Sequence, residues 1–296
     1  MLKYLQQYAT MRAETLPRVT RPSEISVDEV GVGQLCSRVL DVADLEDQVF
    51  LERSHELQFS RKNQHRKDWE KTVVSLLVDH FGLAKDEVAC LGLGVGKEVL
   101  LFHFTKHCGS VVGIDLYRSA VWDSAALAAD DVYEASPFPY RRERLTIRHM
   151  DMRNLKFEPA SFDFVWSISS VEHVGTISEV VQVFREIERV LRPGGHAFIT
   201  TEWNLLQENP RYVHDCIIFD DALVNHLMVS VPRLSLVGPI KRRQSDSPLH
   251  AYHINWRSNI NTEIRPLYNI FTGGTFATPI VLVVRKNGPS PSDMQM

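Results

Sequence analysis

The sequence predicts an α/β fold, in which helices cover both faces of a mostly parallel, doubly wound sheet. From residue 86 onward, short apolar runs alternate with amphipathic segments, and a glycine-rich turn follows the first run. This alternation is typical of βαβ units, whose parallel strands are buried on both faces. Seven runs are the predicted strands, at residues 88–93, 111–115, 145–150, 162–168, 196–201, 234–238 and 279–284.

The remaining segments complete the predicted organisation. Residues 1–85, rich in charge and helix formers, form a helical extension, and residues 86–287 form the sheet domain. Residues 288–296, with their prolines and serines, form a disordered tail. Apolar residues at three- and four-residue steps predict helices at residues 27–40, 60–81, 177–191 and 220–229. Two long connections, residues 116–144 and 241–278, are expected to carry functional loops.

Composition limits the classes of function. With 44% hydrophobic and 24% charged residues, the chain has the balance of an ordinary globular protein. The net charge of -4 gives no general attraction to nucleic acid or to anionic membranes. The four cysteines are widely spaced, and no apolar segment is long enough to be a signal peptide or to span a bilayer. We therefore expect a cytoplasmic protein without nucleic-acid or membrane partners; the sequence does not indicate its oligomeric state.

Three alternating glycines, Gly92, Gly94 and Gly96, follow the first predicted strand and precede a helix. Glycine lets the backbone turn tightly and approach a ligand closely, while the helix presents free N–H groups. The dinucleotide fingerprint requires another glycine at position 97, where this chain has Lys97, which argues against NAD. A tight turn without any ligand is the alternative.

Two further strand ends carry polar groups. Asp115 ends the strand at 111–115, and an acid at this place can accept hydrogen bonds from both ribose hydroxyls of a nucleoside; capping the next helix is its alternative role. Glu172 and His173 follow the strand at 162–168. Histidine has a near-neutral pKa and can accept a proton from a hydroxyl or amine, so both residues are catalytic candidates. Packing over a ligand or capping a helix are the alternatives for His173.

Together these segments resemble class I S-adenosylmethionine-dependent methyltransferases. The resemblance extends over about residues 69–201 and rests on Trp69-Glu70, Leu91–Glu98, Asp115-Leu116-Tyr117, Asp151, Ser169–His173 and Leu191–Gly195. Within that superfamily the chain resembles bacterial methyltransferases of glycan or secondary-metabolite pathways. The resemblance implies a Rossmann-like, seven-stranded sheet and S-adenosyl-L-methionine as the cofactor.

The resemblance also assigns cofactor contacts. The methionine part would lie against Gly92, Gly94 and Gly96, the ribose at Asp115 and Leu116, and the adenine at Asp151 and Met152. Ser169 would lie near the methyl group. The family usually has an acid two residues before the first glycine, where this chain has Cys90, and Glu98 is a candidate substitute.

The sequence indicates contacts to the methyl acceptor less specifically than contacts to the cofactor. Glu202 and Trp203 follow the fifth predicted strand, and His250 and His253 lie in the last long loop, so all four are candidate substrate contacts. No metal site is predicted, because the two histidines offer only two ligands and lack HxH or HExxH spacing. The predicted function is methyl transfer to a small molecule. A nicotinamide-dependent oxidoreductase and a non-catalytic binding module are the alternatives.

Overall fold

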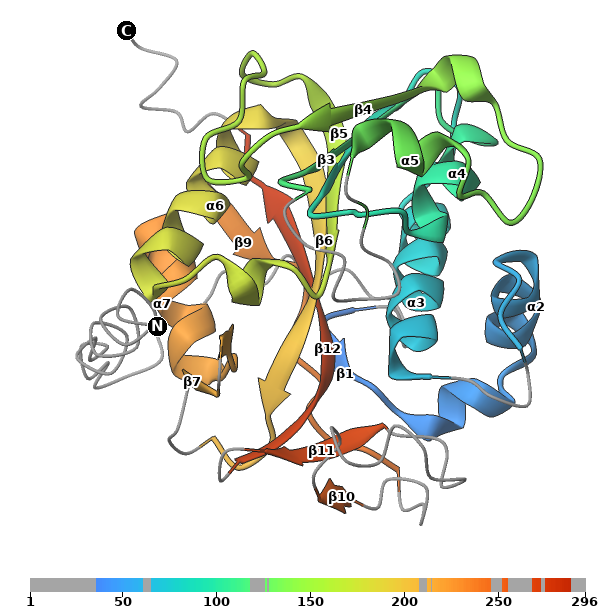
Figure 1. Ribbon diagram of the computed structural model, residues 1–296. Helices are drawn as coiled ribbons and strands as arrows, with labels where there is room; N and C mark the ends of the chain where they lie inside the picture. Colours follow the sequence, from blue (N-terminus) through green and yellow to red (C-terminus); the bar gives the residue numbers. More distant parts are fainter. Residues whose placement is uncertain are drawn as a thin grey trace, which may run out of the picture.

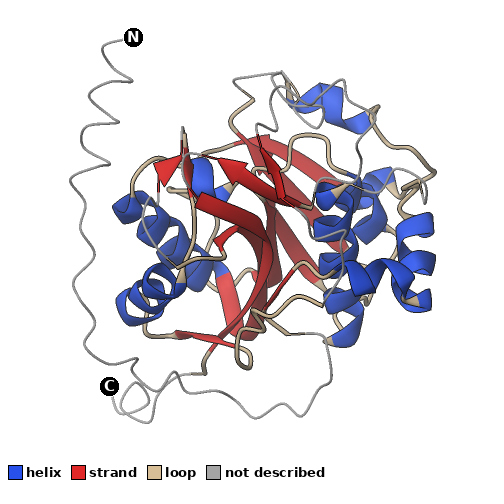
Figure 2. Cartoon of the chain, turned by 90° about the horizontal axis from the view of Figure 1, so that it is seen from below, coloured by secondary structure: helices blue, strands red, loops and turns tan. Residues whose placement is uncertain are grey.

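The computed structural model describes residues 36–60, 65–117, 126, 128–207, 212–213, 215–245, 252–254, 268–272 and 275–288. A twisted sheet forms the middle layer of this part, and helices cover both of its faces (Figure 1). Figure 2, seen from below, shows the helices gathered on two sides of the strands. Within the described residues, no helix has the length and apolar character needed to cross a membrane.

The central strands run parallel to one another, as predicted. Their spatial order is β4 (Leu145–His149), β3 (Ser110–Asp115), β2 (Ala89–Leu93), β5 (Phe162–Ile168) and β6 (Leu191–Asn204). Next comes β12 (Thr275–Lys286), which pairs antiparallel with β6 over nine residue pairs, from Ala277 to Arg285. Because β2 to β6 are parallel, their carboxyl ends all lie at one edge of the sheet.

All seven predicted strands are present, and the sheet contains more. Within the described residues it has ten strands, because short additional strands join the seven. The predicted strand at residues 234–238 is β9 (Leu234–Leu236), and the additional strands are β1 (Arg38–Val39), β10 (Tyr252–Ile254) and β11 (Asn269–Thr272). A separate hairpin consists of β7 (Tyr212–Val213) and β8 (Cys216–Ile217).

Three of the short strands share the outer edge of β12. β11 pairs with β12 near residue 276, β1 pairs with residues 280–281, and β9 pairs with residues 284–286. The prediction of a helix at residues 27–40 is wrong for its described part, since residues 36–40 contain β1 instead. Local periodicity cannot reveal this strand, because its pairing partners, Lys241 and β12, lie more than 200 residues away.

The helices lie close to their predicted places. One face of the sheet carries α6 (Ile177–Val190) and α7 (Asp221–Ser230), and the other carries α3 (Arg66–His80) and α4 (Val99–Thr105), with α2 (Gln48–Glu56) packed on α3 (Figure 1). Shorter elements are η1 (Val42–Glu46), α5 (Ala129–Tyr133), η2 (Arg142–Arg144) and η3 (Val171–His173). Helix α3 belongs to the predicted extension, yet it packs against β5, β6 and β12.

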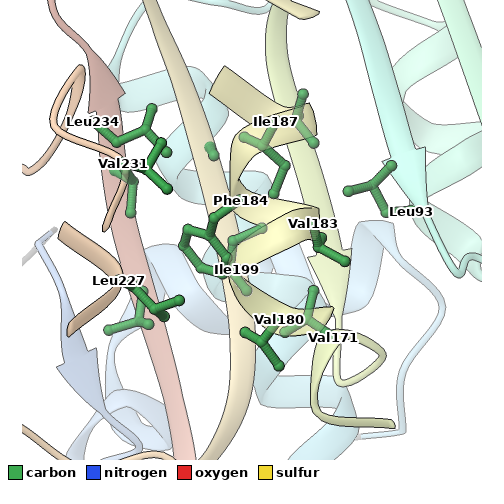
Figure 3. Close-up of a cluster of buried hydrophobic side chains, with 14 of the residues drawn as sticks. Leu93, Val171, Val180, Val183, Phe184, Ile187, Ile199, Leu227, Val231 and Leu234 are labelled. Atoms are coloured by element: carbon green, nitrogen blue, oxygen red, sulfur yellow. The ribbon is translucent and has the colours of Figure 1, made fainter. Parts of the chain in front are cut away.

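The sequence determines where helix α6 begins and which of its faces is buried. Thr176 caps it, with the Thr176 hydroxyl accepting from the Glu179 N–H at 3.2 Å and the Glu179 carboxylate accepting from the Thr176 N–H at 2.8 Å. Its apolar stripe then enters the core on one face of the sheet. Figure 3 shows Val180, Phe184 and Ile187 of α6 packed near Ile199 of β6 and Leu227 of α7.

Candidate active site

The glycine turn after β2 is sterically required. Gly94 and Gly96 have φ angles of 64° and 50°, a left-handed region that side chains rarely adopt. A Cβ on Gly94 would lie 2.5 Å from Cβ of Ser170, and a Cβ on Gly92 would lie 2.4 Å from the ring of Trp166. Gly92 is therefore needed for packing inside the sheet, and Gly94 is needed both for the turn and for the close approach of the loop after β5.

Asp115 joins the end of β3 to this turn. One carboxylate oxygen accepts a hydrogen bond of 2.8 Å from the Gly96 N–H, and the other accepts one of 3.2 Å from the Tyr117 N–H. The Gly94 N–H in turn donates to the Ile114 carbonyl at 2.8 Å. Asp115 and Leu116 are half-buried, so the predicted ribose contacts lie beside the predicted glycines at one edge of the sheet.

The end of β4 reaches the same place. Met152 lies close to the turn, with its terminal methyl 3.0 Å from where a Cβ on Gly94 would be. The carboxylate of Asp151 accepts hydrogen bonds from Arg153, the shortest at 2.7 Å, and Arg153 also pairs with Glu179. Asp151 is therefore held in an ion pair that the sequence reasoning did not foresee.

Glu98 follows the turn but is directed into the protein. Its side chain is 5% exposed, and its carboxylate accepts a hydrogen bond of 2.5 Å from the indole N–H of Trp166. Burial raises the pKa of Glu98 to about 8, an effect that the hydrogen bond from Trp166 reduces only in part. Cys90, at the position of the usual acid, is fully buried in β2.

The chain turns sharply after β5. Ser169 has a φ of 45°, unusual for a residue other than glycine, and its N–H donates to the Thr200 carbonyl at 3.1 Å. The Ser169 hydroxyl donates to Glu70 at 2.6 Å. The hydroxyl of the next residue, Ser170, donates to the Gly94 carbonyl at 2.8 Å. These bonds fix the loop after β5 against the glycine turn.

Helix α3 supplies charged residues to which the sequence assigned no role in the site. Glu70 is fully buried and also accepts hydrogen bonds from Thr200 at 2.8 Å and Lys67 at 3.0 Å. Although burial opposes ionisation, Lys67 and Arg66 and the two hydroxyl donors hold the pKa of Glu70 below its usual value. Arg66 pairs with Glu202, the candidate after β6. Residues of the N-terminal extension therefore form one side of the site.

A signal for Glu70 was present in the sequence. Arg66, Glu70, Val73, Val74 and Leu77 recur at three- and four-residue steps on one face of α3, and all are buried. A charged residue within an apolar helical stripe must find a partner inside the fold.

Glu172 and His173 lie together in η3, just beyond β5. The Glu172 carboxylate is 1% exposed, and neither of its oxygens has a hydrogen-bond partner among the described residues. Burial raises the pKa of Glu172 to about 7. His173 is exposed, with its Nδ1 3.2 Å from the Asp215 carbonyl oxygen. The structure thus places a buried carboxylate with a near-neutral pKa beside an accessible imidazole.

The other acceptor candidates differ in placement. The Trp203 side chain is 1% exposed and belongs to the core, so the structure gives it no access to an acceptor. His250 lies outside the described residues, and for His253 only the backbone, in β10, is described. Of the four candidates, Glu202 is the one whose side chain is seen beside the site.

The strand order, the glycine turn and the acid at the end of β3 define a Rossmann-like domain of the nucleoside-binding type. Residues 90–199 match the family model described as a methyltransferase domain. These residues are therefore similar to a methyltransferase domain, in agreement with the resemblance.

The comparisons with individual proteins cover different shares of the chain. It is 28% identical over 154 residues to 27-O-demethylrifamycin SV methyltransferase of Amycolatopsis mediterranei, and the match spans about half of each protein, 52%. Geranyl diphosphate C-methyltransferase of Streptomyces coelicolor is similar in structure with a TM-score of 0.49 and 18% identity, covering 86% of this chain and 90% of that one. For 1,6-didemethyltoxoflavin-N1-methyltransferase of Burkholderia thailandensis the TM-score is 0.48 with 14% identity, over 83% and 89%.

Proposed function

We propose that this protein transfers the methyl group of S-adenosylmethionine to a small-molecule acceptor. The observation that carries the proposal is the convergence of three strand ends on one turn. Asp115 after β3 accepts from Gly96, Ser170 after β5 donates to Gly94, and Met152 after β4 lies against Gly94. A nucleoside bound over this turn would be contacted from three sides.

The residues present fit this cofactor. The half-buried Asp115, beside the glycine turn, can accept hydrogen bonds from ribose hydroxyls. When bound, S-adenosylmethionine supplies a methyl group activated by a positively charged sulfur. The protein mainly has to align the acceptor, and good alignment is equivalent to an effective concentration of about 10⁵ M or more.

The proton acceptor in this proposal lies after β5. The pKa of about 7 allows Glu172 to take a proton from an acceptor hydroxyl or amine near neutral pH. Neither oxygen of Glu172 has a hydrogen-bond partner among the described residues, so taking up this proton would break no hydrogen bond that the structure shows. His173 lies at the surface beside it and can pass the proton to solvent. The Glu70–Ser169 hydrogen bond keeps the loop that carries both residues in place.

A small acceptor agrees with the other observations. The substrate named for the Amycolatopsis relative, 27-O-demethylrifamycin SV, is a small molecule. The net charge of -4 makes nucleic acid a poor acceptor. All four cysteines are free, which agrees with a reducing, cytoplasmic location. We therefore propose a cytoplasmic enzyme of glycan or secondary-metabolite assembly.

Heat stability in the presence of ligands tests the cofactor assignment against the nicotinamide alternative. A ligand that binds only the folded protein stabilises it by about 2.7 kcal/mol when present at 100 times its Kd. We expect S-adenosylhomocysteine to raise the melting temperature and NAD or NADP to leave it unchanged. The opposite result would favour an oxidoreductase. S-Adenosylhomocysteine binding without its formation from S-adenosylmethionine, across a panel of hydroxyl and amine acceptors, would favour a binding module.

A further inference from the structure

Three potential metal ligands from two distant segments meet beside the proposed acceptor position. They are a carboxylate oxygen of Glu172, a ring nitrogen of His173 and Sγ of Cys216, and the three atoms lie within 4.8 Å of one another. Glu172 and His173 belong to η3, and Cys216 begins β8, which packs against η3. Because Cys216 lies more than forty positions after His173 in the chain, the spacing of the three residues gives no metal-binding pattern in the sequence.

The unsatisfied carboxylate of Glu172 is an independent sign that a ligand is missing. It is 1% exposed, and both oxygens lack a hydrogen-bond partner among the described residues. The buried carboxylate of Glu70, by contrast, accepts hydrogen bonds from two hydroxyls and a lysine. A buried carboxylate without partners is unfavourable unless it binds a proton or a cation.

The imidazole of His173 is already tied to the segment that carries the thiol. Its Nδ1 lies 3.2 Å from the carbonyl oxygen of Asp215, the residue before Cys216. A hydrogen bond from one ring nitrogen to a backbone carbonyl is the usual way in which proteins orient a metal-binding histidine. The same bond keeps η3 and β8 together, so the ligands are held before any ion arrives.

The elements of the three donor atoms indicate which metal ion they would bind. One sulfur, one nitrogen and one carboxylate oxygen suit Zn²⁺, whereas Mg²⁺ and Ca²⁺ prefer oxygen alone. Ligand distances of about 2.0 to 2.3 Å around tetrahedral zinc place neighbouring donor atoms about 3.5 Å apart. Atoms that lie within 4.8 Å of one another need only small side-chain rotations to reach this arrangement.

We propose that Glu172, His173 and Cys216 bind one Zn²⁺ ion whose fourth coordination position is open. On binding, the Cys216 thiol releases its proton to solvent and forms the sulfur–zinc bond as a thiolate. The open position takes water or the oxygen or nitrogen of the acceptor. In this form Glu172 is a zinc ligand instead of the proton acceptor, and the acceptor polarised by the ion would release its proton to solvent before methyl transfer. Only this last step rests on the proposed function; metal binding itself does not.

Cobalt substitution tests the site without an activity assay. We expect the full-length protein, first stripped with a chelator, to bind one equivalent of Zn²⁺ by competition with a chromophoric chelator. Co²⁺ in its place should give tetrahedral visible bands and a near-ultraviolet sulfur-to-cobalt band. Cys216→Ser should lose the sulfur band, and His173→Ala and Glu172→Gln should each weaken binding by about tenfold or more.

Cys36→Ser is the matched control, because it removes another thiol, one that lies beside Gly238. It should keep both the stoichiometry and the sulfur band. Circular dichroism on each variant separates loss of a ligand from loss of the fold; if Cys216→Ser does not fold, cadmium titration of the wild-type protein reports thiolate ligation by its own ultraviolet band. Absence of bound Zn²⁺ at micromolar concentration, or a sulfur band that survives Cys216→Ser, would overturn the proposal.

The same samples distinguish this proposal from the proposed function. S-Adenosylhomocysteine should raise the melting temperature of the metal-free protein and of the zinc form alike. Stabilisation by S-adenosylhomocysteine without metal uptake would remove the metal site and leave methyl transfer standing. Metal uptake without any stabilisation by S-adenosylhomocysteine would support the metal site and contradict the proposed function.

Discussion

The carboxylate of Glu70 on α3 accepts a hydrogen bond of 2.6 Å from the hydroxyl of Ser169, which lies ninety-nine residues later in the chain. Ser169 has a left-handed backbone conformation, and such a residue persists only where its surroundings hold it. Glu70 therefore links a helix of the N-terminal extension to the loop on which Glu172 and His173 are placed.

Replacing Glu70 tests this link. Glu70→Gln keeps the shape of the side chain but removes the charge that accepts from Ser169, Thr200 and Lys67. Because hydrogen bonds to charged groups contribute about 1.5 to 3 kcal/mol, we expect the free energy of unfolding to fall by about that amount in urea titrations. The exposed Glu143→Gln is the control. Equal midpoints for both variants would show that the link does not stabilise the fold.

Asp115 should determine cofactor affinity. Asp115→Asn removes the charge that receives the Gly96 N–H and, in the proposed complex, the ribose hydroxyls. A loss of about 1.5 to 3 kcal/mol corresponds to about ten- to hundredfold weaker binding of S-adenosylhomocysteine, measured by calorimetry. Glu143→Gln should bind as the wild type does. Unchanged affinity in Asp115→Asn would place the nucleoside elsewhere.

Gly94→Ala should destabilise the protein for two separable reasons. The φ of 64° costs a side chain about 1 to 2 kcal/mol, and the new Cβ would lie 2.5 Å from Cβ of Ser170, adding about 1 to 3 kcal/mol. Ser170→Gly in the same chain removes the contact but not the backbone strain. We therefore expect the double variant to lose less stability than the sum of the two single variants in urea titrations. If the stability losses of the two single variants add exactly in the double variant, the contact between residues 94 and 170 does not contribute to the destabilisation by Gly94→Ala.

The pKa of Glu98 predicts a pH effect on stability. Its folded value of about 8 lies above the ordinary value of about 4.3, so the folded protein holds a proton that the unfolded chain has released between these pH values. Stability should therefore fall as the pH rises through this window.

Glu98→Gln removes this titration while keeping an oxygen that can accept from Trp166. Relative to the wild type, we expect little change at pH 5 and a gain of roughly 1 to 3 kcal/mol at pH 8.5, measured by urea unfolding at both values. The difference between the two pH values cancels the titration of all other groups. A variant that is equally destabilised at both would show that the carboxylate is ionised in the folded protein.

The fold could be predicted because its main elements are encoded locally. The strands at β2, β3, β4 and β5 are short apolar runs, and α6 has a capping residue and a regular apolar stripe, so neighbouring residues suffice to recognise them. The glycine turn and Asp115 were also predictable, because their spacing has a physical reason that does not depend on distant contacts.

The acceptor side of the site depends on contacts that local pattern does not contain. Cys216 reaches Glu172 only because β8 packs on η3, and Arg66 reaches Glu202 only because α3 packs against β5, β6 and β12. Trp203 was a candidate substrate contact by its position after a strand, with burial as the alternative, and the structure buries it. β1 was missed for a similar reason, since its only partners are far away in sequence.

The outer edge of β12 is protected in sections. Between β1 and β9 the Val283 N–H donates to the hydroxyl of Ser37 at 2.9 Å, and near β1 the Leu40 N–H donates to the Pro279 carbonyl at 2.8 Å. A chain that lacked residues 36–40 would leave the middle of this long apolar strand with unpaired amides, a template for another molecule. We therefore expect residues 36–40 to prevent self-association through this edge. Versions of the chain that lack them should precipitate before they lose their secondary structure.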